Sequence, residues 1–168
     1  SGDDVTDGLI IEKMSAAGVL LNESNYRIDA TNMTVRMKPL LPKSSVTFSI
    51  SYSYTLNKKS HIRTGEIEAG AYFIAYFFPR IAVYDDIDGW NRNPYLGTHE
   101  FYNDFCDFNL AITVPADYTV WATGDLENAD KIFKDKYLKR IQQAEASDGY
   151  VTVIDSTDIG MEHTTKGD

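Results

Sequence analysis

The chain contains 168 residues, 43% of them hydrophobic and 24% charged, which is the composition of an ordinary globular domain with a sizeable core. Its formal net charge of −9 argues against proteins that bind nucleic acid or anionic membranes through clustered Lys and Arg. The single cysteine, Cys106, excludes an intrachain disulfide, and its place in an alternating segment predicts a small buried side chain. We therefore expect no nucleic acid and no membrane among the partners.

Strand periodicity dominates the first half of the chain. Residues 1–7 are interpreted as a tag remnant or a disordered lead, because Ser1-Gly2 is typical of an expression tag. Short strands are predicted within 8–17 and 26–38. Between residues 46 and 56, six apolar residues alternate with five hydroxyl-bearing residues, which predicts a long half-buried strand.

Further strands are predicted in the middle of the chain. Residues 71–78 form a continuous apolar run with several aromatic rings, which predicts a strand buried on both faces and packed in the core. Alternating apolar residues predict a strand over 106–114 that Pro115 ends, and another strand follows over 118–122.

One helix is predicted near the C-terminal end, over 129–146, where apolar residues recur on one face and Asn128 can cap the first turn. A last short strand is expected over 150–154, and the polar, aperiodic residues 155–168 are interpreted as a flexible tail or linker. These elements predict a mainly β fold, an antiparallel β-sandwich or saddle-like sheet domain with one helix near its C-terminal end. Residues 8–154 would form this single β-rich domain.

An acidic and aromatic loop supplies the candidate residues for a substrate or domain interface. They are Tyr84, Asp85, Asp86, Asp88, Trp90 and Tyr95. The three aspartates fit a cation site, a contact with a peptide's amino group, or a turn in which carboxylates accept hydrogen bonds from local amides. The turn is favoured, because a calcium loop would add a glutamate further on. The rings fit either a ligand platform or core packing.

Two stretches of the sequence resemble one peptidase family. Phe78-Pro79 followed by Tyr84-Asp85-Asp86 is similar to the family's Phe-Pro-x-Phe-Asp-Glu-Pro segment. Thr113-Val114-Pro115-Ala116, followed by Ala122-Thr123-Gly124, is similar to its Thr-Val-Pro-Ala hairpin, which ends in Ser-Asn-Gly. The chain thus resembles the amino-terminal β-domain of the aminopeptidase N-type zinc metallopeptidases, the gluzincins, in a divergent bacterial branch.

Catalysis in that family needs His-Glu-x-x-His on a helix, which places two zinc ligands beside a general base. The only His-Glu pair of this sequence, His99-Glu100, is followed by Asn103 at the place of the second histidine. We therefore expect no catalytic residue, no metal ligand and no cofactor in this chain. The resemblance implies that the parent protein is a zinc-dependent aminopeptidase, a hydrolase, with the zinc in its catalytic domain.

The resemblance implies a non-catalytic role. The domain would pack on the parent's catalytic domain and close one side of the cleft that holds the peptide substrate. The cellular location is left open, with an exported or periplasmic parent favoured over a cytoplasmic one. The alternative is a free-standing β-sandwich module that binds glycan or protein ligands, and His-Glu-x-x-His downstream in the gene would distinguish the two.

Overall fold

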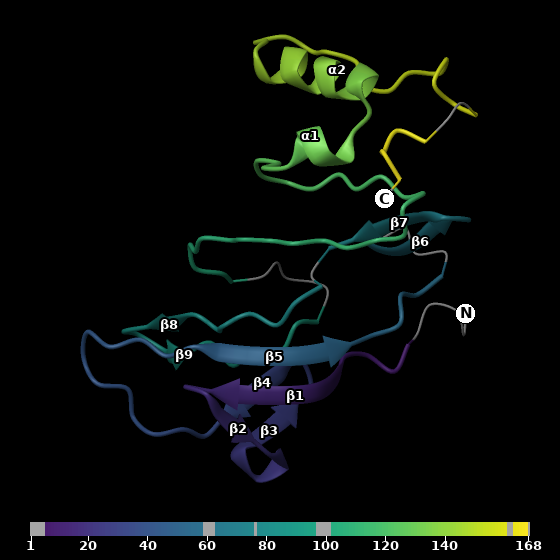
Figure 1. The fold of residues 1–168 in the computed structure, drawn as a ribbon. Coiled ribbons are helices and arrows are strands. Elements are labelled where there is room, and N and C mark those ends of the chain that lie inside the picture. Colours follow the sequence, from purple (N-terminus) through teal and green to yellow (C-terminus); the bar gives the residue numbers. More distant parts are fainter. Residues whose placement is uncertain (1–5, 59–62, 76, 97–101, 161–162, 168) are drawn as a thin grey trace. The chain divides into compact units, whose positions relative to one another are not determined.

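The protein is described by a computed structural model (Figure 1). The structure describes residues 6–58, 63–75, 77–96, 102–160 and 163–167. The chain divides into two compact units, Ser1–Phe105 and Cys106–Asp168, which are treated separately below. Several antiparallel sheets and one main helix near the C-terminus confirm the predicted mainly β class. The extent of the single domain predicted over 8–154 stays a prediction.

A three-stranded antiparallel sheet forms the centre of the N-terminal unit. Its strands are β1 (Ile10–Ala16), β2 (Val19–Leu21) and β5 (Phe48–Ser53), in the order β2-β1-β5. Ala17 and Gly18 both have positive φ, 49° and 77°, as a two-residue type I′ hairpin turn requires. Met14 lies opposite Leu21 on one side and Ile50 on the other, and it is only 2% exposed. The central strand therefore carries the core of this sheet.

The alternation predicted around β5 is confirmed. Phe48, Ile50 and Tyr52 are partly buried, whereas the serines between them are exposed. The strand is shorter than the predicted 46–56, because the ladder with β1 ends where Ser53 lies opposite Ile10. Strand length here depends on the length of the partner.

The remaining strands of the N-terminal unit form three two-stranded hairpins. They are β3 (Tyr26–Asp29) with β4 (Asn32–Val35), β6 (Thr64–Glu68) with β7 (Ala71–Ile74), and β8 (Tyr84–Asp85) with β9 (Gly89–Trp90). A single 3₁₀ turn, η2 (Glu23–Asn25), precedes β3. Asn22 caps this turn, because its side chain accepts from the Ser24 amide at 3.0 Å.

The prediction that 71–78 is a strand buried on both faces is wrong for its described part. All four residues of β7 are exposed, Phe73 at 55% and Ile74 at 49%. The apolar run is typical of a buried strand. Among the described residues, however, β7 pairs with β6 alone, and a two-stranded hairpin buries little side-chain area. Tyr76, within the predicted run, lies outside the described residues.

The strands predicted over 106–114, 118–122 and 150–154 are also wrong. The structure assigns no β-ladder to these segments of the C-terminal unit. Cys106, predicted to be buried, is exposed, as are Leu110, Ile112 and Val114. Alternation indicates which residues share a face of an extended chain, but a strand also needs a partner for its backbone hydrogen bonds.

The predicted helix over 129–146 is divided into α1 (Ala129–Ile132) and α2 (Asp135–Glu145). Asn128 is the N-cap residue, as predicted, but its side chain makes no capping hydrogen bond. The helix is interrupted at Phe133 and Lys134, where the Lys134 amide donates to the carbonyl of Thr164 at 3.0 Å. None of the described residues belongs to a helix long and apolar enough to span a bilayer.

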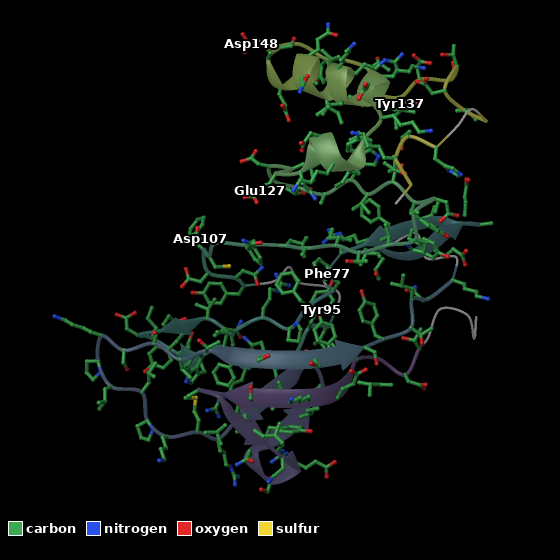
Figure 2. The ribbon with its side chains drawn as sticks, in the orientation of Figure 1. Phe77, Tyr95, Asp107, Glu127, Tyr137 and Asp148 are labelled. Atoms are coloured by element: carbon green, nitrogen blue, oxygen red, sulfur yellow. The ribbon has the colours of Figure 1, made fainter. Side chains whose placement is uncertain are left out.

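The core of the C-terminal unit forms around this interruption. Phe133 is 1% exposed and stacks on Trp121, with ring centroids 5.5 Å apart. Tyr137, labelled on α2 in Figure 2, is 3% exposed. Phe133 also forms an isolated antiparallel bridge with Thr165, whose hydroxyl donates to the carbonyl of Ala116 at 2.8 Å.

Part of the predicted tail is tied to α2 by charge. The side chain of Asp158 is 1% exposed and pairs with Lys136 and with Arg140, whose Nη1 lies 2.7 Å from Oδ2. The hydrogen bond from Lys136, followed by those from the Asp155 amide and from Arg140, holds the pKa of the Asp158 carboxyl well below its usual range. The sequence interpretation of 155–168 as a tail did not anticipate these contacts, because their partners are distant along the chain.

We expect the two faces of β5 to respond differently to a charge. Ile50→Asp places a carboxylate on the half-buried face beside Met14 and should lower the free energy of unfolding by at least about 2 kcal/mol. Ser51→Asp adds the same group to the exposed face, opposite Lys13, and should change it by no more than about 0.5 kcal/mol. Denaturant unfolding followed by circular dichroism measures both, and equal losses would contradict the one-sided sheet.

Candidate functional site

Five of the six predicted site residues lie on one hairpin. Tyr84 and Trp90 are directly opposite in the β8–β9 register, and their rings meet edge to face, with centroids 5.1 Å apart and planes at 70°. Asp85 lies opposite Gly89, whose φ of 72° is in the left-handed region that favours glycine. The hairpin thus places Asp86 and Asp88 at its tip, beside one aromatic pair.

The carboxylate of Asp85 holds the tip of the hairpin in shape. Its Oδ1 accepts hydrogen bonds from the amides of Ile87 at 3.0 Å and of Asp88 at 2.7 Å. These bonds, the one from Asp88 first, lower the pKa of Asp85, because amide donors stabilise the ionised carboxylate. This geometry agrees with the favoured turn interpretation, and it commits Asp85 to the backbone rather than to a ligand.

The tip and the rings face solvent. Ile87 is 88% exposed, Tyr84 is 64% and Trp90 is 50%, while Asp86 and Asp88 are exposed as well. Within the described residues, no group of three or more His, Cys, Asp or Glu side chains is arranged to hold a metal ion. The exposed surface of the hairpin therefore combines the carboxylates of Asp86 and Asp88 with the rings of Tyr84 and Trp90.

The hairpin is anchored at its base. Val83 is 8% exposed, and its carbonyl accepts from the Asn91 amide at 2.8 Å. Asn32 donates from Nδ2 to the carbonyl of Arg92 at 2.8 Å. Tyr95, the sixth candidate and labelled in Figure 2, is placed by its amide, which donates to the hydroxyl of Thr31 at 2.8 Å. Tyr95 is thus held against the β3–β4 turn rather than in the hairpin itself.

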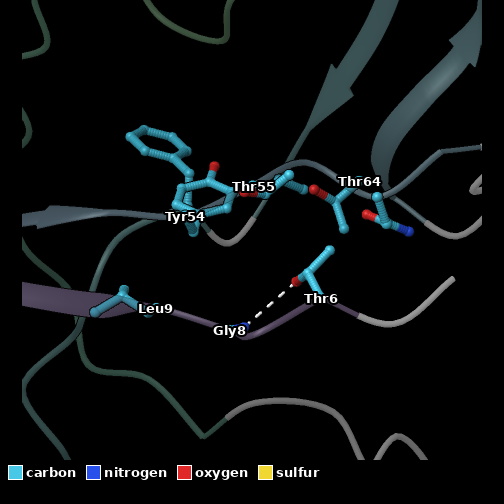
Figure 3. A pocket seen from close by; sticks show the side chains of 9 residues that line it. Thr6, Gly8, Leu9, Tyr54, Thr55 and Thr64 are labelled. Carbon is cyan, nitrogen blue, oxygen red and sulfur yellow. Dashed lines mark hydrogen bonds between the residues drawn. The ribbon is translucent and has the colours of Figure 1, made fainter. Parts of the chain in front are cut away.

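A pocket of about 240 Å³ lies elsewhere in the N-terminal unit (Figure 3). It is lined by Thr6, Gly8, Leu9, Tyr54, Thr55, Asn57, Thr64, Ala75 and Phe77. None of these side chains is charged. Figure 3 shows the side chains of Thr6 and Thr64 pointing toward one another from two sides of the opening.

Three hydrogen bonds to backbone carbonyls position the walls of the pocket. The hydroxyl of Tyr52 donates to the carbonyl of Phe77 at 2.6 Å, which joins β5 to the segment after β7. The Glu66 amide donates to the carbonyl of Asn57 at 2.9 Å, and the Ala75 amide donates to the carbonyl of Arg63 at 3.0 Å. The end of β5 is therefore fixed beside the β6–β7 hairpin.

The sequence did not point to this pocket. Thr55 belongs to the hydroxyl face that the alternation predicts as solvent-exposed, and Tyr54 to the face predicted as core. The alternation holds within β5, but β5 ends at Ser53. Tyr54 and Thr55 therefore lie beyond the ladder. Only the tertiary contacts of the β6–β7 hairpin bring Thr64 and Ala75 to them.

The comparisons with known proteins identify no relative. No protein-family model matches the chain, and no curated protein and no solved structure matches it. His99-Glu100, which the sequence interpretation rejected as a zinc motif, lies outside the described residues. The family resemblance therefore stays a prediction.

Replacing Asp85 should loosen the hairpin tip, and replacing its neighbour should not. Asp85→Ala removes the Oδ1 atom that accepts both hydrogen bonds, so the amides of Ile87 and Asp88 should exchange with solvent much faster, whereas Asp86→Ala, the matched control, should leave them unchanged. Because folding lowers the pKa of Asp85, the contribution of the turn is present above the ordinary Asp pKa and is lost as pH falls through the lowered one. Hydrogen exchange and amide shifts by NMR measure this, and equal effects of the two variants would show that Asp85 does not hold the turn.

Proposed function

We propose that this chain is a non-catalytic β-domain of a zinc aminopeptidase-like metallopeptidase, which packs on a separate catalytic domain and closes one side of a peptide-binding cleft. The proposal is supported by the sequence segments around Phe78-Pro79 and Thr113-Val114-Pro115-Ala116, which resemble that family's amino-terminal domain. Zinc and the general base would belong to the catalytic domain.

The observation that carries the proposal is that large apolar side chains on the β6–β7 hairpin are exposed to solvent. On the β6–β7 hairpin, Ile67, Phe73 and Ile74 are 51%, 55% and 49% exposed. Phe73 and Ile74 are adjacent in the strand, so their side chains lie on opposite faces, and each face of the hairpin carries an exposed apolar side chain. A two-stranded hairpin is only marginally stable by itself, and large apolar side chains exposed on both of its faces suit a surface that a docking domain covers.

The β8–β9 hairpin supplies a second surface with mixed chemistry. Tyr84 and Trp90 offer exposed rings, which are enriched among the residues that dominate binding energy at protein interfaces. The exposed carboxylates of Asp86 and Asp88 suit the ammonium group at a peptide's amino end. This hairpin is therefore our candidate for the edge of the domain interface that faces the peptide.

A specific observation also favours the alternative, a free-standing binding module. The described residues that line the pocket beside β5 are uncharged and all belong to the N-terminal unit, so they need no partner domain to come together. The two functions differ in what the chain must bind: a polypeptide on its hairpins, or a small ligand in its pocket.

The test is calorimetric titration of the chain with the polypeptide encoded by the rest of the same gene. Phe73→Ser and Trp90→Ala each remove an exposed ring and should weaken binding by about tenfold or more if that ring is central to the interface. Asp86→Ala should weaken it less, and Ser51→Ala, on the exposed hydroxyl face of β5, is the matched control. If both ring variants bind as tightly as the control, these hairpins are not the docking surface.

A further inference from the structure

The pocket beside the end of β5 is lined by polar side chains that have no hydrogen-bond partner among the described residues. Among the residues that the structure describes, no hydrogen bond satisfies the side chains of Tyr54, Thr55, Asn57 or Thr64. The Thr6 hydroxyl accepts from the Gly8 amide at 3.4 Å and keeps its proton free to donate. Three threonines, one tyrosine and one asparagine thus line a single opening.

The rest of the pocket lining is apolar. The rings of Tyr54 and Phe77 and the side chains of Leu9 and Ala75 form the rest of its wall. Burial raises the pKa of the Tyr54 hydroxyl, and Tyr52 raises it further, so this group remains a donor at neutral pH. The pocket therefore pairs aromatic surface with groups that both donate and accept hydrogen bonds.

These properties define the ligand by exclusion. Among the described residues that line the pocket, none is a carboxylate that could neutralise an ammonium group, and none is a Lys or Arg that could neutralise a carboxylate or phosphate. A charged ligand would therefore lose hydration without compensation from these residues. The volume, about 240 Å³, lies below the roughly 300–1,000 Å³ typical of pockets for drug-sized ligands, so it suits a single small ring. A purely apolar ligand would cover four polar side chains, those of Tyr54, Thr55, Asn57 and Thr64, and leave them without partners.

We infer that this pocket binds one neutral sugar residue. The hydroxyls of such a ring exchange hydrogen bonds with Thr6, Thr55, Asn57 and Thr64, while its apolar C–H face lies on an aromatic ring of the wall. This binding goes beyond the proposed docking function and does not depend on it, since the site is built within the N-terminal unit alone.

The experiment is titration of the full chain with methyl glucoside, methyl galactoside, methyl mannoside and N-acetylglucosamine, followed by NMR amide shifts. At least one sugar should bind at millimolar concentration and shift the amides of residues 6, 55 and 64. Thr64→Val and Tyr54→Phe keep the shape of their side chains and remove one hydroxyl each, so each should weaken binding roughly three- to tenfold. Thr47→Val makes the same change on an exposed residue that does not line the pocket, and should leave binding unchanged.

Three outcomes would overturn the inference. One is the absence of binding by every neutral sugar in the panel. Another is an affinity that Thr47→Val lowers as much as Thr64→Val does, in variants whose circular dichroism spectra show an intact fold. The third is tighter binding of glucuronate or of an amino-acid amide than of the neutral sugars, which would show that charge, not hydroxyl chemistry, selects the ligand.

Discussion

The antiparallel pairing of β1 with β5 is the interaction on which the N-terminal unit depends. It joins residues about forty positions apart along the chain, over six register pairs from Ile10↔Ser53 to Ala16↔Phe48. It also places Met14 between two neighbouring strands, and burying such a side chain contributes about 1.5–3 kcal/mol. The same pairing determines where β5 ends, and so which residues beyond Ser53 are left to form the pocket.

The C-terminal unit is organised around a buried aromatic side chain, that of Phe133. Its described residues contain no sheet, and its backbone folds around Phe133, where the helix is interrupted and the C-terminal segment bridges to it. Asp158, with Lys136 and Arg140, adds a charged contact between that segment and α2. Of the three side chains only that of Asp158 is buried, so removing Lys136 or Arg140 would leave its carboxylate with less compensation for its lost hydration.

Sequence periodicity correctly predicted which side chains share a face within β5, but it did not predict which extended segments pair with one another. The alternation around Ile50 and the Asp85 turn are properties of neighbouring residues, and the structure shows both. By contrast, the segment around Ile112 has an equally clear alternation and forms no ladder, because pairing depends on a partner that periodicity does not reveal. The helix interruption at Phe133 and the pocket at Thr64 likewise result from contacts across the chain, so no local pattern could have shown them.

The central claim is that this chain combines a small paired core with exposed apolar segments, which we propose that a partner covers. Hydrogen–deuterium exchange of the isolated chain tests it most directly. The account predicts the slowest exchange for the amides of β1 and β5, and exchange near the rate of an unstructured peptide for residues 109–114. Protection of 109–114 equal to that of β5 in the isolated chain would show that this segment already has its partner, and would contradict the account.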